Sequence, residues 1–179
     1  MIVETDVPLL DELLAARWEI VGADFAAYRN HCFRVFNFCV AMADTNEAER
    51  ERLAIATAFH DLGIWSARSF DYLEPSQSLA RDYLTASGRT AWIDEVTAMI
   101  GNHHKITCFQ RCRLSLIEVF RRADWIDVSL GCLSFGVPRT FIRQTLARFP
   151  NAGFHRLLLA QTWQRMKAHP LSPLPMMRL

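Results

Sequence analysis

Histidine and aspartate residues recur over the first 124 positions of the chain, twice as adjacent pairs. The candidate metal ligands among them are, in chain order, His31, His60, Asp61, His103, His104 and Asp124. Imidazole nitrogens and carboxylate oxygens together suit one divalent ion such as Mn, Fe, Co, Ni, Zn or Mg, and leave coordination positions for water and substrate. A bound ion of this kind lowers the pKa of water from about 15.7 to near 7. The sequence therefore predicts a metal site that activates water, provided that these residues converge.

Helical spacing indicates how the second histidine pair is positioned. Ile93, Val96 and Ile100 form an apolar stripe, and His103 and His104 are its next members, three and four residues on. The pair therefore lies at the inner edge of a predicted helix.

Asp124 continues a similar stripe, which begins with Ile117 and Phe120. A carboxylate on an inward-facing stripe requires a cation, a hydrogen-bond donor or a metal, because burying an unpaired charge is costly. Asp127 lies one turn further on and competes for the same role, but Asp124 keeps the phase of the stripe. We therefore prefer Asp124 as the ligand.

Apolar residues recur at helical spacing through nearly the whole chain, and no alternating run is long enough to predict a strand. We expect an all-α fold, as one compact helical bundle over residues 1–179, with the motifs within about 25–130, further helices within about 138–167 and a flexible tail at 168–179. Asn46 and Glu49 predict a capped helix start, and Gly63 predicts a helix stop. The predicted helices cover about 8–18, 25–43, 46–60, 76–87, 90–104, 113–130, 138–149 and 151–167.

Composition excludes several classes of function. The net charge of +1 provides no clear nucleic-acid surface, and no uncharged run is long enough to span a membrane. The chain begins with an acidic segment and has five cysteines at irregular spacing, which favours a cytoplasmic protein with reduced thiols. Homo-oligomerisation stays open.

Four segments carry a resemblance to a known family. They are YRNHCFRVFNF, AFHDLGIW, MIGNHHKI and FRRADWIDVS. Their order is similar to that of the HD-domain superfamily of metal-dependent phosphohydrolases, over about residues 25–130. The resemblance implies that His31, His60, Asp61 and Asp124 are metal ligands, and that His103 and His104 contact phosphate or a second metal.

Two departures from the family pattern bear on mechanism. Members that bind two metals add a histidine where this chain has Ser76, Gln77 and Ser78, so one metal is favoured. The nucleotidase branch has a glutamate shortly after the HD pair, whereas HDLGIW contains no acid. Asp71 and Glu74 in the following loop are alternative sources of an acid or base.

The leading hypothesis is a metal-dependent phosphohydrolase that attacks a nucleotide or another small phosphate ester with a metal-activated water. Two alternatives stay open: a non-catalytic HD domain that binds a nucleotide or a protein partner, and an HD-type iron oxygenase, which needs a second iron. For hydrolysis, the predicted catalytic residues are Asp61, His103 and His104, and Arg34 and Lys105 are the predicted substrate-binding residues.

Other groupings compete with this site. His104, Cys108 and Cys112 recur every four residues, as in a small zinc site, but no fourth ligand is apparent. Trp65 and Phe70 are candidates for a pocket wall beside the HD pair. A further pair, which falls outside the pattern and is predicted to lie on the surface, consists of His155 and His169.

Overall fold

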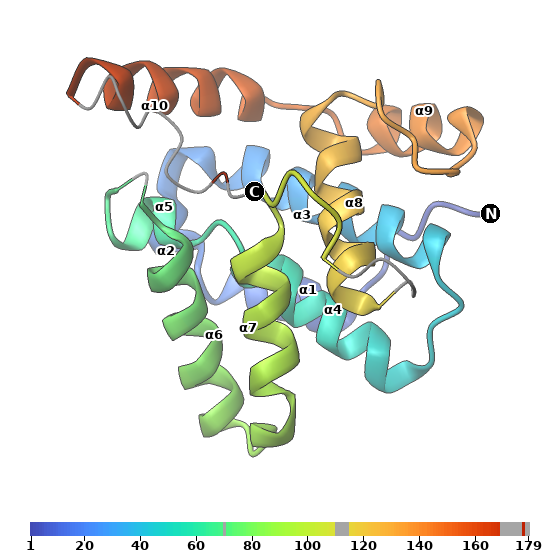
Figure 1. The fold of residues 1–179 in the computed structure, drawn as a ribbon, viewed down its shortest axis with the longest axis horizontal. Coiled ribbons are helices and arrows are strands. Elements are labelled where there is room, and N and C mark those ends of the chain that lie inside the picture. The colour runs from blue at the N-terminus through green and yellow to red at the C-terminus, as the bar shows by residue number, and fades with distance from the viewer. Residues whose placement is uncertain (70, 110–114, 169–176, 178–179) are drawn as a thin grey trace.

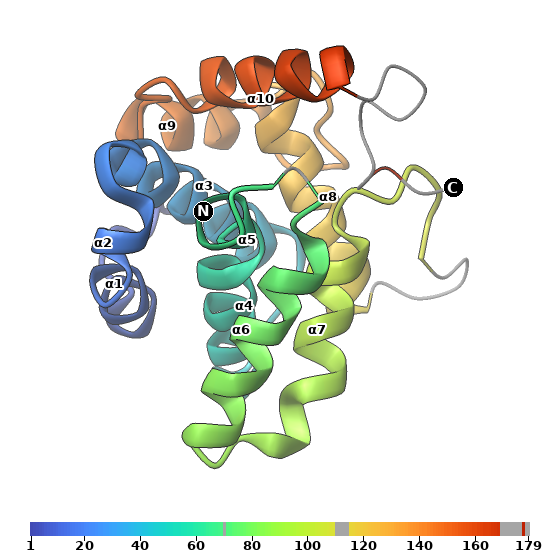
Figure 2. The ribbon, with the colours of Figure 1, turned by 90° about the vertical axis from the view of Figure 1, so that its left-hand side faces the viewer.

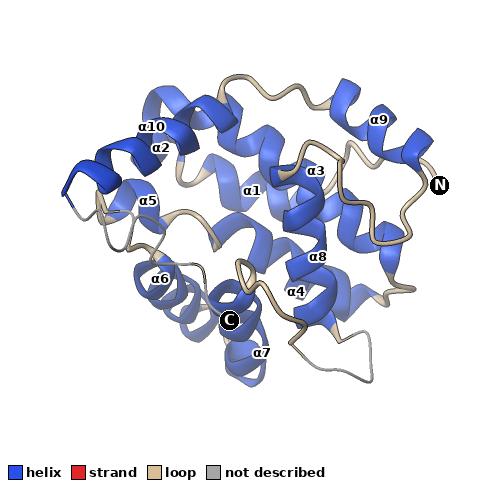
Figure 3. Ribbon diagram, turned by 45° about the horizontal axis from the view of Figure 1, so that its top comes forward, coloured by secondary structure: helices blue, strands red, loops and turns tan. Residues whose placement is uncertain are grey.

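The computed structural model describes residues 1–69, 71–109, 115–168 and 177. Within these residues the backbone forms helices and turns and contains no strand, which confirms the predicted all-α class (Figure 3). None of the described helices is both long and apolar enough to cross a membrane. The helices are α1 (Pro8–Ala15), α2 (Trp18–Val21), α3 (Phe25–Met42), α4 (Glu47–Phe59), α5 (Gly63–Ser66), α6 (Leu73–Ala86), α7 (Ile93–Asn102), α8 (Leu116–Val128), α9 (Arg139–Arg148) and α10 (Phe154–Ala168).

Local sequence signals explain several helix boundaries. Asn46 accepts a hydrogen bond from the backbone of Glu49, and the Glu49 side chain accepts one from the backbone of Asn46, which confirms the predicted start of α4. The segment predicted as one helix over 8–18 is instead divided into α1 and α2. The predicted flexible tail lies outside the described residues except at residues 168 and 177.

α4 ends at Phe59, one residue before the predicted end at His60, but Gly63 does not cap it, because Gly63 is the first residue of α5. Its role is close packing. A Cβ atom at this position would lie 2.3 Å from the carbonyl oxygen of Tyr72 and 2.8 Å from Oγ of Ser76. The Gly63 amide also donates a hydrogen bond to Ser76 Oγ at 2.9 Å. Glycine therefore permits the chain after the HD pair to contact the start of α6.

The helices enclose one large apolar core. α3 and α8 pack together, α6 and α7 form an antiparallel pair, and α10 lies across one side of the molecule (Figures 1 and 2). Aromatic side chains fill the interior, including Phe33, Phe38, Phe59 and Phe120. The ends of α4 and α7 and the inner faces of α3 and α8 thereby meet around a polar centre.

Candidate metal centre

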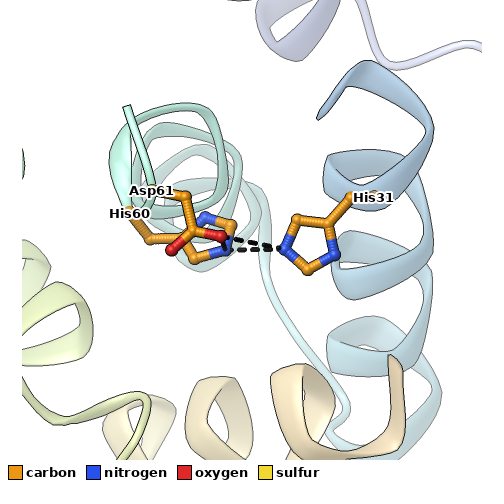
Figure 4. Close-up of side chains that lie close together, drawn as sticks. All are labelled: His31, His60 and Asp61. Atoms are coloured by element: carbon orange, nitrogen blue, oxygen red, sulfur yellow. Dashed lines mark hydrogen bonds and ion pairs between the residues drawn. The ribbon is translucent and has the colours of Figure 1, made fainter. Parts of the chain in front are cut away.

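Two imidazole rings face each other at the middle of the bundle. His31 on α3 donates from Nδ1 to Asp127 at 2.6 Å, and His60 at the end of α4 donates from Nδ1 to the carbonyl oxygen of Thr57 at 2.8 Å. Since both Nδ1 atoms carry the hydrogen in these bonds, each Nε2 presents a lone pair in the neutral ring. The two Nε2 atoms are 2.9 Å apart (Figure 4). A proton or a metal cation is needed to relieve the repulsion between them.

Two carboxylates contribute oxygen atoms to the same point. Asp61 Oδ2 lies 3.5 Å from His31 Nε2 and 3.3 Å from His60 Nε2 (Figure 4). Asp124 Oδ1 lies 3.6 Å and 3.8 Å from the same two nitrogens. The structure thus brings together the four residues predicted as metal ligands, which we call the ligand group: His31, His60, Asp61 and Asp124.

Several polar atoms of the ligand group lack hydrogen-bond partners. Within the described part of the chain, Asp61 Oδ1 and both carboxylate oxygens of Asp124 are buried and have none. Burial of an unpaired carboxylate is costly, and a coordinated cation removes that cost. Together with the facing imidazole nitrogens, these oxygens make a donor set that fits a divalent metal ion.

A second set of donor atoms adjoins the first. His103 Nε2 lies 3.4 Å from Asp61 Oδ1, and His104 Nδ1 lies 3.6 Å from Asp124 Oδ2. One ligand atom from each of Asp61, His103 and His104 lies within 4.8 Å of the others. His104 Nε2 is also 2.6 Å from the hydroxyl of Tyr72. Asp61 therefore belongs to two groups that can hold a metal, although the sequence favoured one ion.

Burial and close charges shift the pKa values of these groups in opposite directions. Burial lowers the pKa of His31, but its hydrogen bonds to Asp127 and Asp61 outweigh burial and raise the value to about 9. Burial and the nearby His31 and His103 lower the pKa of His60 to about 3. In the metal-free protein the proton between the two facing nitrogens therefore belongs to His31.

Asp127 orients His31 through Nδ1, the ring nitrogen that does not face His60. It accepts the Nδ1 hydrogen of His31, and it also accepts hydrogen bonds from Arg34 Nε at 2.5 Å and Nη2 at 2.8 Å. The sequence treated Asp127 as a competing ligand, whereas the structure gives it the role of orienting His31.

Arg34 is not brought to the ligand group. Its side chain is fully buried, and its Nη1 donates to the carbonyl oxygen of Phe149 at 3.0 Å. Its Nε and Nη2 donate to Asp127, and Nη1 also donates to the carbonyl oxygen of Pro150. The guanidinium therefore holds in place the carboxylate that orients His31, and the structure gives no contact through which Arg34 reaches a substrate.

Lys105 follows the histidine pair and is half-buried. Its carbonyl oxygen accepts a hydrogen bond from Arg121 at 3.0 Å.

The two loop acids considered as alternative catalysts, Asp71 and Glu74, are both exposed. Cys108, one member of the alternative zinc grouping, is exposed, and Cys112 lies outside the described residues.

Several residues near the site have surroundings that sequence reasoning did not predict. Tyr72 lies in a loop without periodicity, yet its hydroxyl contacts His104. His155, expected on the surface, is half-buried and hydrogen-bonds the carbonyl oxygen of Val128 from Nε2 at 3.1 Å. Trp65 donates to Asp24 at 3.0 Å, while Phe70 and His169 lie outside the described residues.

A pocket of about 430 Å³ opens beside the ligand group. Its wall includes Tyr72, His104 and Asp124, together with residues at the end of α8 and on α10. Since His104 and Asp124 border both the pocket and the polar centre, a molecule in the pocket lies next to the candidate metal centre.

Comparison of the chain with protein-family models, with curated proteins and with solved structures gives no match. The structure itself establishes a helical fold with a buried cluster of histidine and aspartate residues that can hold a metal ion. This arrangement is compatible with an HD-like site.

Proposed function

We propose that the protein is a metal-dependent phosphohydrolase of the HD type, which acts on a small phosphate ester. The observation that supports this proposal is the convergence of imidazole nitrogens and unpartnered buried carboxylate oxygens at one point. That donor set suits a divalent ion, and it borders a pocket large enough for a small molecule.

The ligand group of His31, His60, Asp61 and Asp124 would hold the ion. When bound, a divalent ion lowers the pKa of water to about 7 and polarises a phosphoryl oxygen. His31 and His60 keep their Nε2 lone pairs directed inward, because their Nδ1 hydrogens are bound to Asp127 and Thr57 respectively.

His103 and His104 favour different protonation states, because the pKa of His103 is raised and that of His104 is lowered. Burial lowers the pKa of His103, but the charges of Asp61 and Asp124 outweigh it and raise the value, which favours a proton on Nε2. This proton can be donated to a phosphoryl oxygen. Burial and the nearby His103 lower the pKa of His104, so its ring stays neutral beside Tyr72 and can accept a proton.

Elemental analysis of the purified protein, followed by a screen of nucleotides and phosphomonoesters with Mn, Co, Ni and Mg, tests the proposal. We expect bound metal and hydrolysis that chelation abolishes and metal restores. Asp61→Ala should lose both metal and activity, whereas Asp71→Ala, a change at an exposed loop acid, should keep both. Intact metal content and activity in Asp61→Ala would refute the proposal. A metal-loaded protein without turnover would favour a binding domain.

A second candidate is an HD-type iron oxygenase. The observation that favours it is the additional donor set of Asp61, His103 and His104, since this chemistry needs two irons. Two irons per chain, with consumption of dioxygen in the presence of substrate, would replace hydrolysis as the preferred function.

A further inference from the structure

The pocket beside the candidate metal centre has an apolar wall. Val128 at the end of α8, Leu158 and Leu159 on α10, and Met177 line it. Leu159 is 70% exposed, so its apolar surface is open to a ligand. Contact with these side chains strengthens binding only when the ligand also buries apolar surface.

The charges around the pocket argue against a ligand with many negative charges. None of the described residues that line the pocket is lysine or arginine. The carboxylates of Asp61 and Asp124 balance the two positive charges of a divalent ion, so the ligand group with its metal has little net charge. A triphosphate would leave most of its charge without a counter-charge there, whereas a single phosphoryl group needs far less compensation.

The position of the pocket links its occupant to the metal. Asp124 and His104 contribute to the pocket wall and to the polar centre at once. When the apolar part of a molecule lies in the pocket between α8 and α10, the other end of that molecule therefore lies next to the ligand group.

We propose that this pocket binds the apolar organic group of a phosphomonoester, and that the preferred substrate is a monophosphate of an apolar alcohol rather than a nucleoside triphosphate. This inference rests on the function proposed above, because that function places the phosphoryl group at the metal.

Alkylphosphonates test the pocket without turnover, because their carbon–phosphorus bond is not hydrolysed as an ester. The dissociation constants of methylphosphonate and hexylphosphonate are measured by calorimetry with the metal-loaded protein. Each methylene buried in an apolar site strengthens binding by about fourfold. We therefore expect hexylphosphonate to bind at least about tenfold more tightly than methylphosphonate, and more tightly than an imido analogue of ATP.

A matched pair of variants on α10 connects the preference to the pocket. Leu159 and Trp163 are both exposed apolar residues, at 70% and 56%, but of the two only Leu159 is in the pocket wall. Leu159→Gln should reduce the preference for hexylphosphonate severalfold and leave methylphosphonate binding unchanged. Trp163→Gln should retain the wild-type preference. Both substitutions are at the surface and add no charge that would repel the phosphonate.

The outcomes separate this inference from the proposed function. Equal affinities for the two phosphonates, no binding of hexylphosphonate, or tighter binding of the ATP analogue would overturn the pocket assignment. Phosphatase activity with no chain-length preference would also overturn it, while the proposed function would stand. A chain-length preference that Leu159→Gln removes, without hydrolysis of hexyl phosphate, would support the pocket and refute hydrolysis.

Discussion

The two aspartates on α8, Asp124 and Asp127, lie one helical turn apart and have opposite surroundings. Asp127 is fully buried and binds His31 and Arg34 through charge-assisted hydrogen bonds. Asp124 is also buried, yet both of its carboxylate oxygens lack hydrogen-bond partners among the described residues. Asp127 therefore has hydrogen-bond partners within the protein, whereas Asp124 has none among the described residues. The satisfied residues thus stabilise the fold, and the unsatisfied ones mark where a ligand is needed.

The largest expected effect is a loss of folding stability when Asp127 is replaced. Asp127→Ala leaves the Arg34 guanidinium buried without its carboxylate, and breaking a buried ion pair in this way costs about 3–5 kcal/mol. We expect a loss of that size in the free energy of unfolding, measured by urea denaturation of the metal-free protein. Asp71→Ala, at an exposed position, should change it by less than about 0.5 kcal/mol. Similar small losses in both variants would contradict the supporting role of Asp127.

The opposite result is expected at Asp124. In the metal-free protein at about pH 4, where Asp124 is protonated in the native state, Asp124→Asn removes no hydrogen bond that the structure records. Stability at this pH should therefore stay within about 1 kcal/mol of the wild type. A divalent ion at about 100 times its dissociation constant should stabilise the wild type by about 2.7 kcal/mol. Asp124→Asn should lose most of this gain in thermal unfolding with and without metal. An unchanged gain would remove Asp124 from the ligand group.

The pH dependence of stability compares the same two carboxylates. Burial raises the pKa of Asp124 from 3.8 to about 7, so the metal-free native state keeps a proton that the unfolded chain releases between these values. The contribution of Asp124 therefore makes stability fall as pH rises from about 4 to 7, by at most about 1.4 kcal/mol per pH unit.

The pKa of Asp127 shifts the other way. Burial raises it, but hydrogen bonds from His31 and Arg34 outweigh burial and lower it from 3.8 to about 2. Its stabilisation is complete above pH 3.8 and is lost as pH falls towards 2.

Urea denaturation between pH 4 and 7 without metal tests the titration of Asp124. The free energy of unfolding plotted against pH should have a less negative slope for Asp124→Asn than for the wild type. Equal slopes would show that Asp124 does not titrate in this range.

The smallest expected effect concerns the hydroxyl of Tyr72. Tyr72→Phe removes its 2.6 Å hydrogen bond with His104, a loss of about 1 kcal/mol in the free energy of unfolding. The matched control is Tyr83→Phe, a half-buried tyrosine whose ring packs against Phe59, and it should change stability little. Equal effects of the two variants would show that the Tyr72 hydroxyl adds nothing to the position of His104.

Helical periodicity made the fold class and part of the site predictable. The phases that placed His103, His104 and Asp124 on inward faces depend only on spacing along one helix, and the structure puts all three at the polar centre. Arg34 shows the limit of this reasoning. Its phase brings it near His31, but its partner Asp127 comes from another helix 93 residues away. Spacing cannot distinguish an arginine that binds substrate from one that binds a carboxylate.

Loop residues were the hardest to predict. Tyr72 has no periodic neighbours, and its contact with His104 depends on how the chain turns after α5. Gly63 was predicted to end a helix because glycine is common there, whereas its purpose is the close approach of Tyr72 and Ser76. Such reasons depend on tertiary packing, which a single sequence does not state.

The packing at Gly63 also limits how this protein can diversify. A side chain of any size there would meet the backbone of Tyr72, and Asp61 lies only two residues earlier. A mutation at residue 63 therefore disturbs the polar centre and one wall of the pocket in a single step. Exposed pocket residues such as Leu159 can change individually without that penalty. New substrate preferences should thus be accessible by substitution on α10, while residue 63 remains glycine.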